Sequence, residues 1–249
     1  MPDTHLRVFA DLEGMSAAAA DLFCELARSR ARWREGNTFS AALSGGSTPQ
    51  RLYELLAAPP FSTEIPWERV HLFQVDERCV PPEDPQSNYR MIRETLLRHV
   101  PIPEANFHRM AAEQPDRDEA ARLYAAELAR ALRPGPREFP RLDLVFLGMG
   151  PDGHTASLFP GSPALGEQTL WVRSNFVEKL ATHRLTLTFP VLNAARRLVF
   201  LVSGAEKAET LRRVLQPDTD ATLLPAQSIR PVDGELSWYV DEAAAEFLE

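Results

Sequence analysis

The sequence predicts an α/β fold, in which a mostly parallel sheet carries helices on both faces. Short runs rich in β-branched and aromatic residues alternate along the chain with longer segments of helical periodicity, the pattern of repeated β-α-β units. These short runs are apolar throughout, as in parallel strands that helices cover on both sides. The chain has 249 residues, of which 44% are hydrophobic, so it can bury a substantial core.

Four segments have the composition of buried strands. They are residues 38–43 (TFSAAL), 70–75 (VHLFQV), 142–148 (LDLVFLG) and 197–204 (RLVFLVSG). Residues 184–192 (RLTLTFPVL) alternate like a half-buried strand, and residues 235–248 (ELSWYVDEAAAEFL) resemble a strand that runs into a closing helix.

Helical patterns, with apolar residues three or four positions apart, lie between the strands. They cover residues 15–33, 50–58, 87–100, 116–132 and 205–215. Residues 132–141 are rich in proline and glycine, but a core strand follows at once, so we expect a surface loop there rather than a linker. Since no internal repeat is evident either, we expect a single domain over residues 1–249.

The composition excludes several classes of function. A net charge of −8 and a pI near 5.4 argue against nucleic acid and against an anionic membrane surface as partners. No apolar stretch reaches the roughly 18 residues of a membrane span, and the first residues lack a signal-peptide pattern. Cys24 and Cys79 cannot form a disulfide framework, and no Cys/His cluster has the spacing of a zinc site. We therefore expect a cytoplasmic protein without a metal.

Three glycines in residues 148–153 have the G-x-G-x-x-G spacing of a dinucleotide-binding loop and follow a predicted strand. Such a loop must open a long helix, whose amino end holds the pyrophosphate. Pro160 and Pro163 leave room for only about two helical turns, because proline clashes with the preceding turn. The spacing therefore does not predict an NAD or flavin site.

The same loop presents Asp152 and His154 at the carboxyl end of a strand, where open α/β sheets place their chemistry. His154 can act as a general base near neutral pH, and Asp152 can fix its tautomer or hold a substrate hydroxyl. A lone histidine is more often structural, but the flanking glycines favour a catalytic role here. The remaining histidines lack such a setting and are expected to be surface or packing residues: His5, His71, His99, His108 and His183.

Residues 44–50 (SGGSTPQ) predict a second functional loop, between a strand and a helix. The glycines permit positive φ, Thr48 can cap the helix and Pro49 suits its first position, so backbone N–H groups would point outward toward a phosphate. The alternative is a well-capped turn without a ligand. The candidate ligands are Ser44, Gly45, Gly46, Ser47 and Thr48.

Charged residues also leave the strand 70–75, where Asp76 can hydrogen-bond sugar hydroxyls or orient water and Arg78 suits a phosphate or a carboxylate. A solvated charge cluster is the alternative reading. Arg184 begins a predicted strand, and Lys207 falls in the first turn of a predicted helix. A cation is unfavourable at that end of a helix unless an anion binds there, although an exposed lysine is the commoner case.

In order and spacing, the motifs from about residue 38 onward resemble the 6-phosphogluconolactonase family, the lactonase branch of the glucosamine/galactosamine-6-phosphate isomerase superfamily. The motifs are SGGSTP, VDER…VP…SNY, GMGPDGHTASLFP, RLTLTFPVLNAAR, SG..K and LPAQSI…W..D. The resemblance implies a Rossmann-like fold and hydrolysis of 6-phospho-D-glucono-1,5-lactone to 6-phosphogluconate, in the pentose phosphate pathway and without a cofactor. The resemblance does not fix the oligomeric state, and we expect a monomer or a small homo-oligomer.

The resemblance also implies roles for the candidate residues. Those near the reacting sugar carbon are Asp76, Asp152 and His154. Those that hold the phosphate are the loop from Ser44 to Thr48, Arg184 and Lys207, while Arg78 holds either phosphate or a sugar oxygen. In the implied mechanism His154 activates a water, and backbone N–H groups of the glycine-rich loops or Arg78 meet the oxyanion.

One departure separates this chain from the related glucosamine-6-phosphate deaminases. Where those enzymes have asparagine, glutamate and proline after D-G-H, with the glutamate assisting ring opening, this chain has residues 157–160 (SLFP). The absence of that acid favours ester hydrolysis over deamination. A non-catalytic sugar-phosphate sensor is a further alternative, but such a module is normally joined to a DNA-binding segment, and none precedes residue 6.

Overall fold

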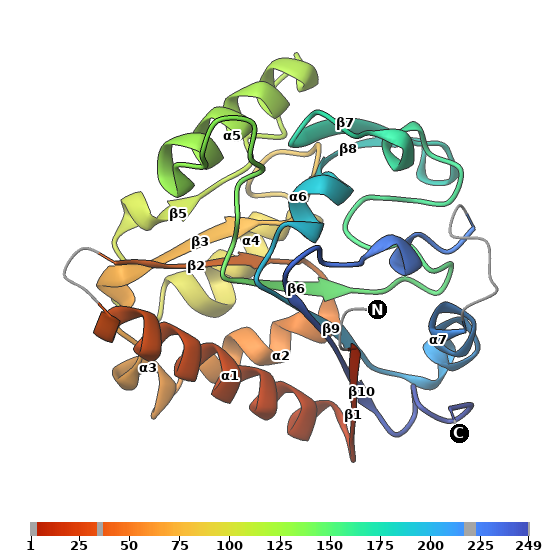
Figure 1. Cartoon of the computed structure of the whole chain (residues 1–249), viewed down its shortest axis with the longest axis horizontal. Coiled ribbons are helices and arrows are strands. Elements are labelled where there is room, and N and C mark those ends of the chain that lie inside the picture. The colour runs from red at the N-terminus through yellow and green to blue at the C-terminus, as the bar shows by residue number, and fades with distance from the viewer. Residues whose placement is uncertain (1–3, 34–36, 217–222, 249) are drawn as a thin grey trace.

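The protein was analysed as a computed structural model that describes residues 4–33, 37–216 and 223–248 (Figure 1). A seven-stranded sheet forms its centre. Its strands are β1 (Thr4–Phe9), β2 (Phe39–Leu43), β3 (Val70–Gln74), β5 (Phe107–His108), β6 (Leu144–Gly148), β9 (Arg197–Val202) and β10 (Glu235–Asp241). They lie in the order β1-β10-β9-β6-β2-β3-β5, and every neighbouring pair is parallel. The predicted fold class is confirmed.

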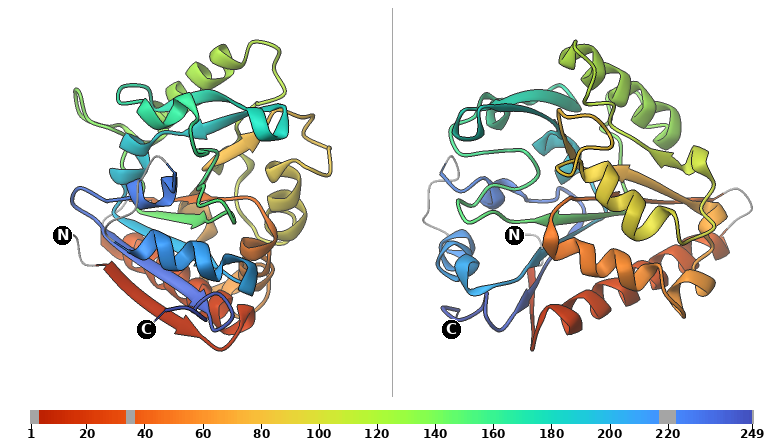
Figure 2. Two further views of the ribbon diagram at one scale, coloured as in Figure 1. Left: turned by 90° about the vertical axis from the view of Figure 1, so that its right-hand side faces the viewer. Right: turned by 180° about the vertical axis from the view of Figure 1, so that it is seen from behind.

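Helices cover both faces of this sheet (Figures 1 and 2). On one face lie α1 (Leu12–Trp33), α2 (Ser47–Leu56) and α4 (Asn88–Ile92), which continues as a π-helical segment over Arg93–Leu97. On the other lie α5 (Arg117–Leu132), α6 (Phe189–Asn193) and α7 (Ala208–Leu215). A short helix, α3 (Phe61–Glu64), follows α2. None of the described helices is long and apolar enough to cross a membrane.

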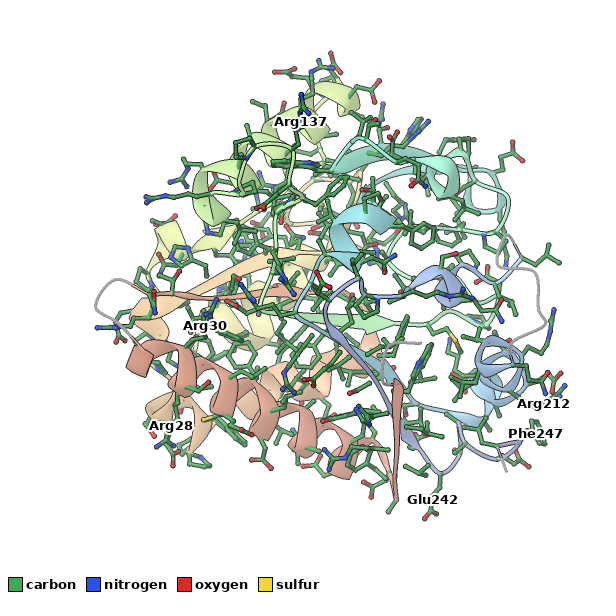
Figure 3. The ribbon with its side chains drawn as sticks, viewed as in Figure 1. Arg28, Arg30, Arg137, Arg212, Glu242 and Phe247 are labelled. Carbon is green, nitrogen blue, oxygen red and sulfur yellow. The ribbon has the colours of Figure 1, made fainter. Side chains whose placement is uncertain are left out.

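The side chains of strand β6 show why helices must cover both faces of the large sheet. Its side chains alternate, so that Leu144 and Phe146 pack into the core beneath α1 and α2, whereas Val145 and Leu147 pack into the core beneath α5 and α6. All four are buried. Side chains fill the space between sheet and helices, while charged ones such as Arg28 and Arg212 project from the periphery (Figure 3).

A second sheet of three antiparallel strands adjoins the first. It consists of β4 (Asp76–Arg78), β8 (Thr182–Leu187) and β7 (Val172–Val177). Val75 joins the two sheets, because its N–H donates to the Leu43 carbonyl in the large sheet and its carbonyl accepts from Leu187 N–H in the small one. The small sheet was not predicted from the sequence, apart from the strand that begins residues 184–192.

Two expected elements are wrong in part. Residues 184–192 are not one strand: β8 ends at Leu187, and Pro190 lies in the first turn of α6, where a missing N–H costs nothing. Residues 235–248 form β10 without a closing helix, and only turns follow Asp241.

Candidate functional site

A cleft of about 600 Å³ lies at the carboxyl ends of β2, β6 and β9, bordered by residues of the small sheet. All eleven residues singled out from the sequence line it. They are Ser44, Gly45, Gly46, Ser47, Thr48, Asp76, Arg78, Asp152, His154, Arg184 and Lys207. The topology explains this convergence, because the carboxyl ends of parallel strands meet at one edge of the sheet. Their individual roles stay predictions.

The loop after β6 is held in a compact turn rather than opening a helix. Gly150 N–H donates to the His154 carbonyl at 2.9 Å, and the Thr155 hydroxyl donates to the Gly148 carbonyl at 2.9 Å. The Thr210 hydroxyl of α7 donates to the Pro151 carbonyl at 2.7 Å, which ties the loop to the neighbouring element. No helix begins in residues 153–162, so the loop lacks the helix amino end that a dinucleotide pyrophosphate requires.

This turn places Asp152 and His154 side by side. Asp152 Oδ1 lies 2.5 Å from His154 Nδ1, and the imidazole stacks on Phe159 with ring centroids 4.1 Å apart. The hydrogen bond from His154, with a smaller contribution from Lys179, holds the pKa of Asp152 well below its usual range. The carboxylate therefore stays ionised and favours the tautomer with the proton on Nδ1. His154 Nε2 has no hydrogen-bond partner among the described residues, which leaves it available to a substrate.

Asp76 is buried in the wall of the same cleft and is held by two neighbours. Ser157 Oγ donates to Asp76 Oδ2 at 2.6 Å, and Asn88 Nδ2 donates to the Asp76 carbonyl at 2.9 Å. The first turn of α4, which carries Asn88, is itself fixed by Glu77, whose buried carboxylate accepts from the backbone N–H groups of Arg78, Asn88 and Tyr89. Burial raises the pKa of Glu77 in spite of these bonds.

Arg78 and Arg184 lie directly opposite each other on β4 and β8. Arg184 is only 8% exposed, and its burial, followed by the charge of Arg78, lowers its pKa. Like charges in register destabilise a strand pair. In the part of the chain that the structure describes, no carboxylate lies within ion-pair distance of either guanidinium. An anionic ligand would relieve this repulsion.

The loop from Ser44 to Thr48 differs from its prediction in two respects. Helix α2 begins at Ser47 with Gly46 as the N-cap residue and without a side-chain cap, so the predicted capping role of Thr48 is wrong. Pro49 is the third residue of the helix and not the first, although it still lies in the first turn, where its missing N–H costs nothing. Gly46 has the expected positive φ of 107°. Gly45 is needed for a different reason, because a Cβ there would lie 1.7 Å from Asn88 Oδ1.

Lys207 ends a 3-10 turn, Ala205–Lys207, that leads directly into α7. It is the N-cap residue of the α-helix and lies in the first turn of the helical segment predicted for residues 205–215. Asp241 holds the preceding segment, since it accepts from the Ser203 hydroxyl and the Gly204 N–H. No ion pair of Lys207 with a described carboxylate is found.

Sequence reasoning missed five polar lining residues, namely Asn88, Ser157, Lys179, Ser203 and Glu206. Asn88 and Ser157 stand inside motifs that were recognised, so their position in those motifs is a usable signal. With Lys179 and Glu206 included, four cations and three carboxylates line the cleft of a chain whose net charge is −8. The cleft is therefore much more positive than the molecule as a whole. No group of three or more potential metal ligands occurs among the described residues.

Known proteins resemble this chain in sequence over most of its length. The family model for glucosamine-6-phosphate isomerases/6-phosphogluconolactonase matches residues 10–238. A 6-phosphogluconolactonase of Synechocystis sp. is 43% identical over 91% of this chain and 92% of its own. The human 6-phosphogluconolactonase is 40% identical over 98% and 93%.

A solved structure agrees with these sequence matches. The structure of 6-phosphogluconolactonase from Trypanosoma brucei superposes with a TM-score of 0.87, at 30% identity and with complete coverage of both chains. The match extends over both sheets and the loops around the cleft, since no part of the chain is left uncovered. This chain therefore belongs to the family of glucosamine-6-phosphate isomerases and 6-phosphogluconolactonases.

Proposed function

We propose that this protein hydrolyses 6-phospho-D-glucono-1,5-lactone to 6-phosphogluconate, with His154 as the general base. One observation carries the proposal: the His154–Asp152 pair shares its cleft with Arg78, Arg184 and Lys207, for which no ion pair with a described carboxylate is found. A base and several cations without a described carboxylate partner in the same cleft suit a neutral reacting group attached to a phosphate. The names of the relatives support the same reaction.

In the proposed mechanism a water molecule lies between His154 Nε2 and the lactone carbonyl carbon. His154 takes one proton as the water oxygen bonds to C1, and the carbonyl oxygen becomes negative. The C1–ring oxygen bond then breaks, and His154 returns the proton to the departing ring oxygen. The second water proton stays on the new carboxylic acid and leaves to solvent.

Asp152 and Asp76 have different tasks in this mechanism. Asp152 fixes the imidazole and stabilises the imidazolium that forms, as its 2.5 Å contact with Nδ1 allows. Asp76 is tied to Ser157 and lies beside Asn88, so it suits a fixed acceptor for a sugar hydroxyl rather than a mobile base. Arg184, Arg78, Lys207 and the loop from Ser44 to Thr48 bind the phosphate.

Deamination of glucosamine 6-phosphate is the competing activity within the family. It needs an acid to assist ring opening, and the position implied for that acid falls in residues 157–160 (SLFP). None of these four residues is an acid, and Ser157 donates a hydrogen bond to Asp76. The absence of an acid from this segment supports hydrolysis over deamination.

A coupled assay separates the candidate functions. The purified protein is given 6-phosphogluconolactone or glucosamine 6-phosphate, and spontaneous lactone hydrolysis is subtracted. We expect hydrolysis of the lactone and no ammonia from the amino sugar. Release of ammonia would identify a deaminase, and binding of both phosphosugars without turnover of either would identify a sensor.

A further inference from the structure

Lysine is rare in this chain. Only two of its 27 basic side chains are lysines, and both Lys179 and Lys207 line the cleft. They come from different elements, because Lys179 lies in the 3-10 turn Glu178–Leu180 between β7 and β8, whereas Lys207 precedes α7. A lysine ammonium is a compact point charge with three donors, unlike the planar fork of arginine. The cleft thus holds two such charges at separate places.

Lys179 is the cleft cation that contacts the catalytic pair. Its Nζ lies 3.3 Å from Asp152 Oδ2, while Asp152 Oδ1 lies 2.5 Å from His154 Nδ1. One carboxylate therefore joins the ammonium and the imidazole. The Lys179 side chain is 70% exposed, so the contact with Asp152 leaves other N–H donors of the ammonium open to the cleft.

The charges that form during the reaction indicate what the N–H donors of Lys179 do. Before proton transfer, the Asp152 carboxylate is the only charged group of the His154–Asp152 pair, and it also contacts the Lys179 ammonium. Once His154 is protonated, the imidazolium balances Asp152, and the ammonium can balance the new negative charge on the substrate. Arg78 and Arg184 suit the phosphate instead, because two guanidiniums in register match a dianion better than a single developing charge.

We propose that Lys179 is a catalytic residue whose ammonium binds the oxygens on C1 of the substrate. It donates hydrogen bonds to the carbonyl oxygen as that oxygen becomes negative, and to the carboxylate of the product. Lys179 transfers no proton and forms no covalent bond. The inference rests on the proposed function and deepens it by assigning the cation at the reacting end of the cleft.

Two ligands that differ only at C1 test this assignment. 6-Phosphogluconate carries a carboxylate there, and glucitol 6-phosphate carries a hydroxymethyl group beside the same phosphate. Binding of each is measured by isothermal titration calorimetry to the wild type, Lys179→Met, Lys207→Met and Arg122→Met. Arg122 is the matched control, because it is 64% exposed, pairs with Glu119 and lies outside the cleft. Turnover of the lactone is measured in parallel.

Lys179→Met should weaken binding of 6-phosphogluconate about tenfold or more and leave binding of glucitol 6-phosphate within about twofold. It should also lower kcat by about a hundredfold to a thousandfold, as the loss of an oxyanion donor does. Lys207→Met should weaken both ligands equally, and Arg122→Met neither. Equal effects of Lys179→Met on both ligands, or none, would overturn the assignment. Because the titrations need no turnover, they test Lys179 even if the wild type fails to hydrolyse the lactone.

Discussion

At the scale of single residues, the position of the His154 ring depends on the absence of a side chain at Gly150. A Cβ at that position would lie 2.1 Å from both Cε1 and Nδ1 of the ring. Stacking on Phe159 and the bond to Asp152 then fix the orientation of the imidazole. Gly150, one of the three glycines with the spacing of a dinucleotide-binding motif, thus allows His154 to pack against the backbone.

Replacing His154 with asparagine should lower kcat by about 10²-fold to 10⁴-fold and change KM little, because a general base acts mainly in the transition state. The measurement is steady-state hydrolysis of 6-phosphogluconolactone, corrected for the spontaneous reaction. A variant that keeps kcat within about threefold of the wild type would show that His154 is not the base.

Gly150→Ala should lower kcat at least about tenfold, because the new methyl group displaces the ring by more than the reaction tolerates. Gly166→Ala is the matched control, since a Cβ there meets nothing within 4 Å and the residue lies outside the cleft. Kinetics and thermal unfolding are compared for both variants. Unchanged turnover in Gly150→Ala would contradict the packing argument.

At the scale of elements, the strand pair β4–β8 places two arginines opposite each other, an arrangement that suits anion binding but destabilises the strand pair. Arg78 and Arg184 face each other on neighbouring strands without a described carboxylate partner. The arrangement favours binding of an anion at the expense of the unliganded sheet.

Arg184→Met should therefore raise KM for the phosphorylated lactone and, in the absence of ligand, stabilise the protein by about 0.5 kcal/mol. KM is measured for phosphorylated and unphosphorylated gluconolactone, and the free energy of unfolding by urea titration. If KM rises equally for both lactones, Arg184 does not recognise the phosphate.

A second pair of elements, β3 and β5, carries two histidines outside the cleft, of which His108 is buried and His71 is partly buried. His108 Nδ1 lies 2.6 Å from Glu127 Oε1, and its Nε2 lies 2.9 Å from His71 Nδ1. Burial lowers the pKa of His108, although Glu127 opposes the shift, and burial also lowers the pKa of His71. Both histidines are therefore neutral in the folded protein at pH values where they are charged in the unfolded chain.

The sign of the pH dependence follows from these lowered pKa values. Below about pH 6.5 the unfolded chain binds more protons, so the free energy of unfolding should decrease from pH 7 to pH 5.5, by at most about 1.4 kcal/mol per pH unit for each histidine. Urea titrations across this range measure the decrease, and His108→Gln should reduce it. An unchanged pH dependence in that variant would show that these two histidines are not its source.

At the scale of the whole molecule, the cleft is formed by two sheets that share a backbone junction. Val75 bonds to Leu43 on one side and to Leu187 on the other. The hydrophobic core beneath α5 and α6 also contains residues of both sheets, such as Phe73 and Leu185. Neither sheet can separate from the other without exposing that core.

The protein should therefore unfold as one unit over residues 1–249, as the expected single domain requires. Differential scanning calorimetry should give one transition, with equal calorimetric and van't Hoff enthalpies. Saturating 6-phosphogluconate should shift that transition to higher temperature without splitting it. Two resolved transitions would divide the chain into separately folding parts.

The sequence by itself determined the parallel sheet and much of the site. Strands 70–75 and 197–204 were predictable because burial on both faces requires continuous apolar runs, and loops at their carboxyl ends must converge. The His154–Asp152 pair was predictable because two residues separated by a glycine on one turn cannot move far apart. The spacing of residues along the chain is sufficient to predict such strands and such neighbouring side chains.

Only the tertiary structure decided which partners those residues meet. Antiparallel pairing set Arg78 against Arg184, and the turn between β7 and β8 brought Lys179 to Asp152, 27 positions away in the chain. The edge strand β1 and the strand β7 carry no continuous apolar run, since exposed or polar positions interrupt both. Pairing across the chain depends on the free energy of the whole packed fold, so no local pattern encodes these contacts.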